Sequence, residues 1–170
     1  MHPKKERTFV AIKPDGVQRS LVGEVISRFE RVGLKLVAIK LAVVSEEHVE
    51  KHYEKLDEKI KAHLKKYMTS GPVVAMVWEG ANSVKLVRKL VGSTEPLSSD
   101  VGTIRGDFVL DSYAMADADG RAVRNLIHAS GNVEEAEFEI HHWFKSEELI
   151  NYTLVQEKIL YDVNIDGILE

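Results

Sequence analysis

The sequence predicts one α+β domain in which helices pack on a four-stranded antiparallel sheet. Segments with strand-like apolar content alternate along the chain with segments of helical periodicity. The 170 residues, 44% hydrophobic and 29% charged, are sufficient for one sizeable core. We find no internal repeat, low-complexity segment or linker that would divide the chain. Residues 1–170 are therefore expected to form a single domain.

Four segments are predicted to be strands. Residues 8–13 form an apolar run that ends in a lysine and is followed by the turn tripeptide Pro-Asp-Gly. Residues 34–44 are rich in Val, Leu and Ile. Residues 73–78 are apolar on both faces, which is typical of a central strand. Residues 103–110 are predicted to be the fourth strand.

Helices are predicted from apolar stripes and from capping residues. Ser45, followed by acidic residues, and Asn132, followed by Glu135 three positions later, are typical N-terminal caps. Asn82 is predicted to cap a further helix that Gly92 terminates. The predicted helices cover residues 21–31, a segment from 45, residues 59–68, 82–91 and 132–143, and a final short segment from 146. This order fits a ferredoxin-like βαββαβ sandwich with its helices on one face of the sheet.

Composition excludes several classes of function. The net charge of −4 and the pI of about 6.0 argue against general nucleic-acid binding, which favours a basic surface. No apolar run approaches the roughly 20 residues of a membrane span, and the basic residues 1–7 precede no signal-peptide core. The absence of cysteine rules out disulfides and thiol catalysis and fits a cytoplasmic protein.

Three cations occupy positions that fit an anionic ligand. Lys13 ends an otherwise apolar strand, where it would either face a ligand or be a solvated strand end. Arg88 lies on a predicted helix, where an exposed structural arginine is the alternative. Arg105 precedes Gly106 in a predicted strand, which suggests a close backbone approach or a bulge. Its guanidinium could bind a phosphate bidentately or pair with Asp107 on a solvated face.

His128 is the histidine whose sequence setting is most unusual. It lies between an apolar pair and Ala-Ser, just before a capped helix, where the helix dipole would favour a phosphate. Other histidines lie on predicted helices among charged neighbours: His48, His52, His63, His141 and His142. The adjacent pair in that set lacks the spacing of zinc ligands on a helix. The chain also lacks the P-loop and G-x-G-x-x-G motifs, so bound phosphates would depend on side-chain cations and a metal.

Several stretches of the chain, in order, resemble the nucleoside diphosphate kinases. They are residues 6–19, 67–68, 71–80, 102–108, 125–130, 139–140, 143–144 and 147–149. Residues 125–130, Asn-Leu-Ile-His-Ala-Ser, match the N-x-x-H-[GA]-S signature of that family. The similarity spans about residues 6–152 with one interruption. The chain is therefore similar to these enzymes over most of its length.

The resemblance implies an enzyme that transfers the γ-phosphate of a nucleoside triphosphate, mainly ATP, to a nucleoside diphosphate. In the implied ping-pong reaction, His128 is the nucleophile and carries the phosphate on its pros nitrogen. Ser130 and Glu139 would orient the imidazole and fix its tautomer. Fixed counter-charges and contacts to phosphates and ribose would come from the remaining residues of the matched motifs: Lys13, Tyr53, Arg88, Thr94, Arg105 and Asn125. Of these, Lys13 and Tyr53 would take part in catalysis.

The resemblance also implies cofactors and partners. Mg²⁺ would bridge the nucleotide's own phosphates and water, so no set of protein metal ligands is expected. The substrates would be ATP, GTP, ADP and GDP, with neither nucleic acid nor membrane as a partner. The family forms hexamers and sometimes tetramers, and residues 93–102 resemble the loop that packs between subunits in hexamers. Val101 stands where a proline is common. A homo-oligomer is expected, with a hexamer favoured over a tetramer.

The chain departs from the family where the nucleobase would bind. Ile60 stands where an aromatic residue usually stacks on the base, and Gly131 replaces the usual aspartate. Residues 109–123 are about ten residues longer than in the common form, with the insert at about 111–122. Tyr113 or Met115 in this insert could replace the missing base contact or cover the site; alternatively, the insert packs on a neighbouring subunit. Residues 153–170 form a short C-terminal extension.

The alternative from a different class of function is a binding or regulatory module that has lost catalysis. The loss of His128, Lys13 or Arg105 would indicate it, and all three are present. The sequence therefore favours an enzyme.

Overall fold

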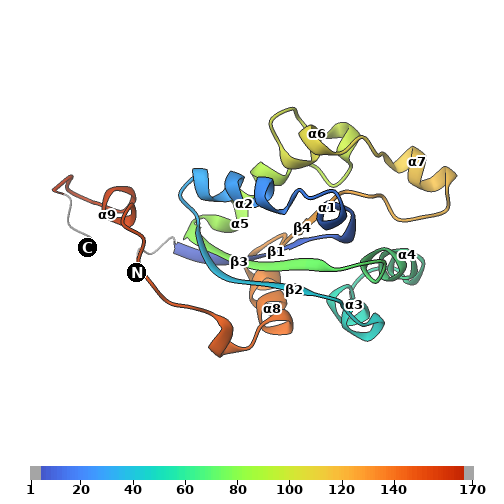
Figure 1. The fold of residues 1–170 in the computed structure, drawn as a ribbon, viewed down its shortest axis with the longest axis horizontal. Helices are drawn as coiled ribbons and strands as arrows, with labels where there is room; N and C mark the ends of the chain where they lie inside the picture. Colours follow the sequence, from blue (N-terminus) through green and yellow to red (C-terminus); the bar gives the residue numbers. More distant parts are fainter. Residues whose placement is uncertain (1–4, 167–170) are drawn as a thin grey trace.

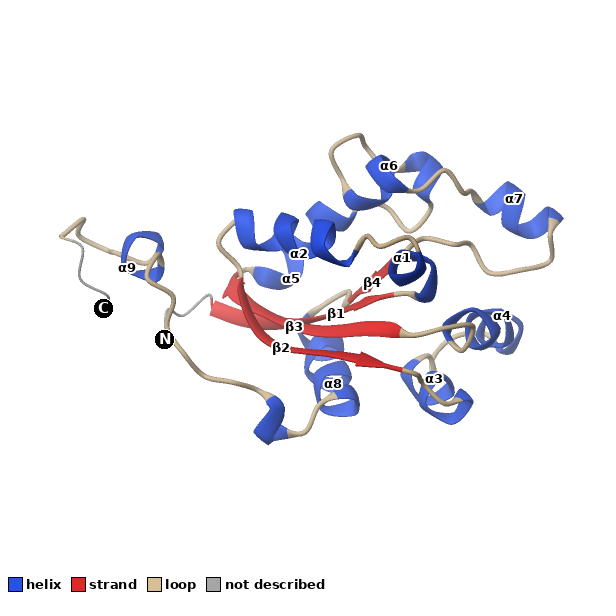
Figure 2. Ribbon diagram, viewed as in Figure 1, coloured by secondary structure: helices blue, strands red, loops and turns tan. Residues whose placement is uncertain are grey.

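A four-stranded antiparallel sheet forms the centre of the computed structural model, which describes residues 5–166. The strand order is β2-β3-β1-β4 (Figure 2). The strands are β1 (Lys5–Ile12), β2 (Lys35–Ala42), β3 (Val73–Ala81) and β4 (Ile127–Ala129). This arrangement confirms the α+β, ferredoxin-like class.

The two central strands are almost completely buried. β1 pairs with β3 from Lys5↔Ala81 to Ile12↔Val74, and β3 is buried from Val73 to Gly80. The apolar run at residues 73–78 therefore correctly predicted a central strand. Apolar residues on both faces are needed here because both faces of the sheet are covered.

Helices cover both faces of the sheet, so the prediction that they lie on one face is wrong (Figure 1). One core joins α2 (Val22–Arg31) and α5 (Ser83–Val91) to the sheet around Phe29 and Trp78. The other joins α8 (Val133–Trp143), α3 (Glu46–His52) and α4 (Glu58–Met68) around Phe9. Side chains alternate along β1, which sends Val10 into the first core and Phe9 into the second.

The predicted strand at residues 103–110 is wrong, because this segment contains a short helix, α6 (Ile104–Phe108). Its start is capped by Thr103, whose hydroxyl accepts a hydrogen bond from the Gly106 backbone N–H. A Cβ at Gly106 would collide with the backbone carbonyl of Asp100, so this glycine permits a close approach and does not mark a bulge. The fourth strand is instead β4, which contains the His128 segment.

Several predicted helix boundaries need correction, while the caps at Ser45 and Asn132 are confirmed by their side-chain hydrogen bonds. Asn82 is not a side-chain cap, because its backbone is left-handed (φ 53°) and its side chain caps nothing. Gly92, at φ 90°, ends α5 as predicted. The turn after β1 is a helical segment, α1 (Pro14–Gln18). Short 3₁₀ segments occupy the other predicted loop and helix regions: η1 (Pro96–Ser98) and η2 (Ser146–Glu148).

The segment after η2 returns along the sheet and contains α9 (Glu157–Leu160), so the helix from 146 is not the last. The Glu157 carboxylate pairs with Lys5 and Lys35, which also contact Glu79. The Tyr161 hydroxyl accepts a hydrogen bond from the Ala81 backbone N–H. These contacts fasten the extension to β1, β2 and β3. Among the described residues, no helix is long and apolar enough to cross a membrane.

Candidate active site

A cavity of about 460 Å³ opens where α4 and the inserted helix α7 (Tyr113–Ala118) approach the His128 strand. Figure 1 shows α7 and α4 at the same end of the molecule. The cavity wall contains all predicted site residues except Ser130 and Glu139: Lys13, Tyr53, Ile60, Arg88, Thr94, Arg105, Asn125 and His128. Segments that lie far apart in the sequence therefore converge on one cavity, and its wall includes four Lys and Arg side chains: Lys13, Arg88, Arg105 and Arg121.

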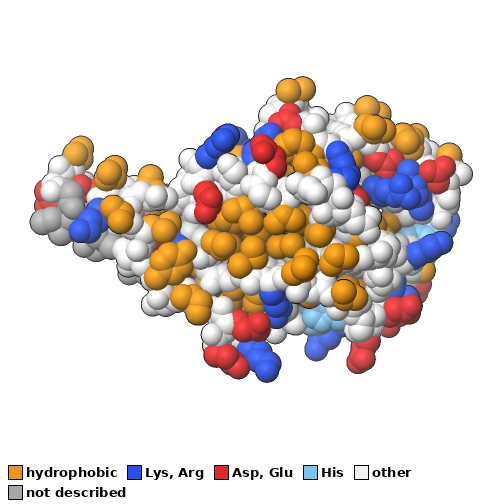
Figure 3. Space-filling view, viewed as in Figure 1, with side chains coloured by type: hydrophobic (Ala, Val, Ile, Leu, Met, Phe, Trp, Pro, Cys, Tyr) orange, Lys and Arg blue, Asp and Glu red, His pale blue; other side chains and the backbone are white. Residues whose placement is uncertain are grey.

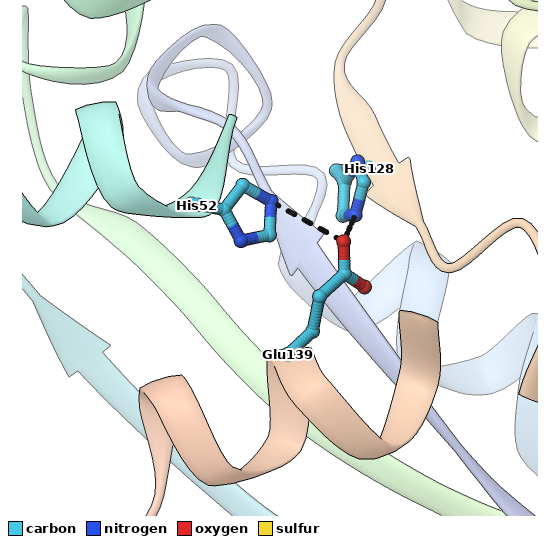
Figure 4. Close-up of side chains that lie close together, drawn as sticks. All are labelled: His52, His128 and Glu139. Atoms are coloured by element: carbon cyan, nitrogen blue, oxygen red, sulfur yellow. Dashed lines mark hydrogen bonds and ion pairs between the residues drawn. The ribbon is translucent and has the colours of Figure 1, made fainter. Parts of the chain in front are cut away.

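His128 lies inside β4, opposite Ala11 of β1, and not at a helix start as predicted. Its contact with α8 is made through a side chain: His128 Nε2 lies 2.7 Å from Glu139 Oε1. The Ser130 hydroxyl donates to the other Glu139 oxygen at 2.6 Å. Because the carboxylate accepts, Nε2 carries the hydrogen and Nδ1 keeps its lone pair. Figure 4 shows the second ring nitrogen of His128 turned away from Glu139.

His52 belongs to the same cluster, although sequence reasoning grouped it with the ordinary helix histidines. It is buried, and its Nε2 lies 3.6 Å from Glu139 Oε1 (Figure 4). Its Nδ1 accepts a hydrogen bond from the Trp143 indole N–H at 3.1 Å. Burial, and then the proximity of His128, lower the pKa of His52 well below its usual value. The sequence gives no signal for His52, because Glu139 and Trp143 come from the distant α8.

The tautomer of His52 decides whether this cluster can bind a metal ion. Ligand atoms of His52, His128 and Glu139 lie within 4.8 Å of one another. The Trp143 indole is a donor only, so Nδ1 of neutral His52 must be the bare nitrogen and Nε2 must carry hydrogen. A protonated nitrogen has no lone pair for a metal. The three residues therefore form a hydrogen-bonding group around a carboxylate and not a metal centre.

Lys13 is buried, which excludes the alternative of a solvated strand end. Its Nζ donates to Asn125 Oδ1 at 2.7 Å, and Asn125 Nδ2 in turn donates to the Thr94 carbonyl at 3.0 Å. Burial, together with the nearby positive charge of Arg105, lowers the pKa of Lys13 to about 7. The cavity therefore holds a lysine amino group whose charged form an anionic ligand would stabilise.

We expect the binding of a phosphate-bearing ligand to be coupled to proton uptake at Lys13. Its pKa of about 7 leaves much of the free protein with neutral lysine near pH 8, and a bound phosphate would raise that pKa. Calorimetric titration with a nucleoside triphosphate in two buffers of different ionisation enthalpy should then give different apparent enthalpies. Lys13→Gln should remove most of that difference, whereas Lys89→Gln on α5 should retain it. Equal enthalpies for the unaltered protein would contradict this coupling.

The same pKa shift has a consequence for stability. In the unfolded chain the lysine pKa returns to about 10.5, so between about pH 7 and 10.5 the unfolded chain binds more protons at this position. The contribution of Lys13 to the free energy of unfolding therefore rises with pH in that window.

Arg105 is buried and donates to four backbone carbonyls, those of Asn125, Gly92, Ser93 and Ile127. A guanidinium has five N–H groups, so one remains for a ligand, and a bidentate phosphate contact would require breaking a backbone bond. Burial, and then the charge of Arg88, lower the pKa of Arg105 to about 10. The predicted alternative, a pair with Asp107, is wrong because Asp107 pairs with Arg28. Arg105 therefore has a structural role as well, because it holds together the backbone segments around the cavity.

Arg88 and Tyr53 have more freedom to contact a ligand. Arg88 makes one long contact, 3.5 Å from Nη1 to the Ala129 carbonyl. The Tyr53 hydroxyl is buried and has no hydrogen-bond partner within residues 5–166. Burial raises the pKa of Tyr53, so the phenol stays protonated and can donate. Both side chains therefore offer hydrogen-bond donors at the cavity wall.

Part of the cavity wall is aliphatic, and the insert contributes to the wall. Ile60 lines the cavity from α4 and is 51% exposed. Tyr113 lines the cavity from α7, whereas Met115 does not. Of the two insert residues singled out in the sequence, only Tyr113 is therefore in a position to touch a ligand in this cavity.

Comparison with known proteins places the chain among phosphotransferases. The family model of nucleoside diphosphate kinase matches residues 6–149. Nucleoside diphosphate kinase B of Mus musculus is 54% identical over 158 residues, which cover 92% of this chain and 97% of the relative. Human nucleoside diphosphate kinase A is 51% identical over the same shares.

Solved structures agree with the sequence comparison. The chain is similar to nucleoside-diphosphate kinase from Borrelia burgdorferi with bound vanadate and ADP, at a TM-score of 0.87 and 43% identity. That match covers 91% of this chain and 95% of the other. An NDP kinase from Pyrobaculum aerophilum matches with a TM-score of 0.83 and 41% identity over 86% of this chain and all of that one. The chain therefore belongs to the nucleoside diphosphate kinase family of phosphotransferases.

Proposed function

We propose that this enzyme transfers the γ-phosphate by a ping-pong reaction through a phosphohistidine at Nδ1 of His128, with ATP as the main donor. The observation that carries the proposal is the 2.7 Å contact of His128 Nε2 with Glu139, which leaves Nδ1 as the nucleophilic nitrogen. The similar Borrelia structure holds ADP and vanadate, which supports an adenine nucleotide as a ligand of this cavity.

The reaction needs two phosphoryl transfers in opposite directions. In the first, the Nδ1 lone pair attacks the γ-phosphorus, and the bond from that phosphorus to the β-phosphate oxygen breaks, releasing the diphosphate. In the second, a β-phosphate oxygen of the acceptor attacks the phosphohistidine, and the N–P bond breaks. Glu139 stabilises the positive charge that the imidazole ring gains on phosphorylation, and the Ser130 hydroxyl holds that carboxylate in place.

The cations of the wall would supply the electrostatic stabilisation. Charge spread over the transferred phosphoryl oxygens would face Arg88, Lys13 and the remaining N–H of Arg105. The Tyr53 hydroxyl would donate to the same region. Lys13 and Arg105 are fixed before substrate binds, because both are buried and hydrogen-bonded to the protein.

The residues present fit a magnesium ion that is held by the nucleotide and not by the protein. The two carboxylates in the cavity wall are Asp117 and Glu135, and Glu135 is engaged with the Gly131 backbone N–H. This leaves no group of hard oxygen ligands in the described wall. When bound between the phosphates, Mg²⁺ would neutralise part of their charge.

A labelling experiment tests this proposal. The protein is incubated with γ-labelled ATP, and the label is expected to be acid-labile and base-stable, as a phosphohistidine is. Dilute ADP or GDP should remove it as labelled triphosphate. A protein that takes up no label, or a label that neither diphosphate removes, would contradict the ping-pong reaction.

We also propose that the chain forms a homo-oligomer, with a hexamer favoured over a tetramer. Leu97 and Val101 near η1 are 73% and 92% exposed. Figure 3 shows further hydrophobic side chains gathered across the middle of one face, and Ile39 and Leu41 of the edge strand β2 are exposed. Exposed apolar patches beside an edge strand are typical of subunit contacts. Sedimentation equilibrium should give six times the chain mass.

A further inference from the structure

The insert is a rigid part of the cavity wall. Asp111, at its start, accepts two hydrogen bonds from Arg121 (2.6 and 3.1 Å) and one from the Arg124 backbone N–H (2.7 Å). Ser112 caps α7 by accepting from the Met115 N–H, and the Tyr113 N–H donates to Glu95. The insert is therefore tied to itself, to residue 124 and to the loop after α5. A helix held at both ends can present a fixed surface to a ligand.

One face of α7 is turned to the cavity. Tyr113, Ala116 and Asp117 line it, and their spacing of i, i+3 and i+4 places them on the same side of the helix. Ala116, between the other two, is 3% exposed. Leu56, Ile60 and Leu64 line the cavity from the other side. A flat apolar ligand group would fit between the two helices.

The two ends of this face differ in what they approach. Tyr113 is one of the nearby groups that act to raise the pKa of Arg105, and its backbone N–H donates to Glu95, the neighbour of Thr94 in the chain. This end belongs to the phosphate half of the cavity. Asp117 is one helical turn, roughly 5 Å, further along α7. Asp117 therefore lies in the half that remains for the nucleobase once the phosphates face His128.

The Asp117 carboxylate is available to a ligand. It has no hydrogen-bond or ion-pair partner in residues 5–166, since the nearby Arg121 is engaged by Asp111 and Asp119. A carboxylate offers two acceptors side by side. Guanine presents two adjacent donors, N1–H and the 2-amino group, which match them. Adenine presents a donor beside the bare N1, which would face the second carboxylate oxygen unfavourably.

We propose that α7 forms one wall of the nucleobase site and that Asp117 makes the acceptor step prefer guanine over adenine nucleotides. The inference rests on the proposed function for the identity of the ligand. A charge-assisted hydrogen-bond pair at an exposed site is expected to give a preference of about ten-fold. Inosine, which keeps N1–H but lacks the 2-amino group, should be intermediate.

The test uses the phosphorylated full-length protein. Discharge by GDP, IDP and ADP is measured at limiting concentration, and the ratio of kcat/KM for GDP to that for ADP is compared among variants. Asp117→Ala should bring the ratio close to one. Asp117→Asn, whose amide pairs a donor with an acceptor, should favour ADP. Met115→Ala, outside the cavity on the same helix, and Glu47→Gln, a charge control on α3, should keep the ratio of the unaltered protein.

The outcomes separate this inference from the proposed function. If His128 becomes phosphorylated and the phosphate is transferred equally well to GDP and ADP, the proposed function is supported and the role of Asp117 is overturned. A GDP preference that survives in Asp117→Ala overturns it too. If no phosphoenzyme forms, calorimetric Kd values of GDP and ADP for the unphosphorylated protein give the same ratio without catalysis. Equal Kd values would then overturn the inference independently.

Discussion

Replacing His128 by alanine is expected to abolish phosphoenzyme formation and to reduce kcat by about 10⁴-fold or more, because the variant lacks the imidazole that carries the phosphate. The nearest alternative nucleophile is His52, but its bare Nδ1 is occupied by the Trp143 N–H and its Nε2 carries hydrogen. Neither nitrogen of His52 can therefore attack a phosphate while this hydrogen bond is kept. The measurement is incorporation of label from γ-labelled ATP, followed by the steady-state rate of GTP formation from GDP.

A matched control for this variant is His141→Ala. His141 lies on α8 near Glu139 in the sequence, but it is exposed and its Nδ1 contacts only the Glu137 carbonyl. His141→Ala should be labelled and discharged like the unaltered protein. Thermal unfolding of both variants shows whether the fold is kept, which the partial exposure of His128 leads us to expect. A label of undiminished amount in folded His128→Ala would refute the assignment of the nucleophile.

The local sequence predicted correctly the strand that is buried on both faces, but not a segment whose conformation depends on tertiary contacts. Residues 73–78 identified a central strand because an apolar run buried on both faces has few other solutions. The strand predicted at residues 103–110 was wrong because the Arg-Gly pair in this segment resembles an interrupted strand. The decisive interactions there are tertiary: Asp107 is held by Arg28, and Gly106 lies against the Asp100 carbonyl. Such contacts override a weak local preference.

The site shows the same division between local and distant information. His128 and Ser130 share one motif, and Glu139 lies on the capped helix that follows, so the sequence could place them near one another. His52 is recognisable only through Trp143 and Glu139 on another helix. The hydrogen bonds of Arg105 to four backbone carbonyls could not be predicted either, because any residue could supply such carbonyls. Sequence patterns reveal side-chain types, but they do not reveal which backbone groups need a donor.

Arg105→Ala is expected to lower both stability and activity, whereas Arg88→Ala should lower activity alone. Arg105 satisfies four backbone carbonyls from a buried position. Leaving them unpaired should reduce the free energy of unfolding by about 3–5 kcal/mol. Arg88 is exposed and makes one long contact, so its loss should change the free energy of unfolding by less than about 0.5 kcal/mol. The kcat of Arg88→Ala should nevertheless fall by about 10²–10³-fold, as for other donors that stabilise a transition state.

Denaturant unfolding and kcat measured on the same preparations separate the two roles. Arg105→Lys sharpens the comparison, because it keeps the positive charge but loses the planar fork that reaches several carbonyls at once. If Arg105 acted only as a counter-charge, lysine would restore most of the activity and alanine would leave unfolding unchanged. The geometry leads us to expect the opposite, that both substitutions destabilise the protein. The Arg105 side chain donates to the carbonyls of Gly92, Ser93 and Ile127, and these hydrogen bonds join the end of α5 to the His128 strand. Arg105 would thus hold in register the strand that carries the nucleophile, so its removal would displace His128 as well as weaken phosphate binding.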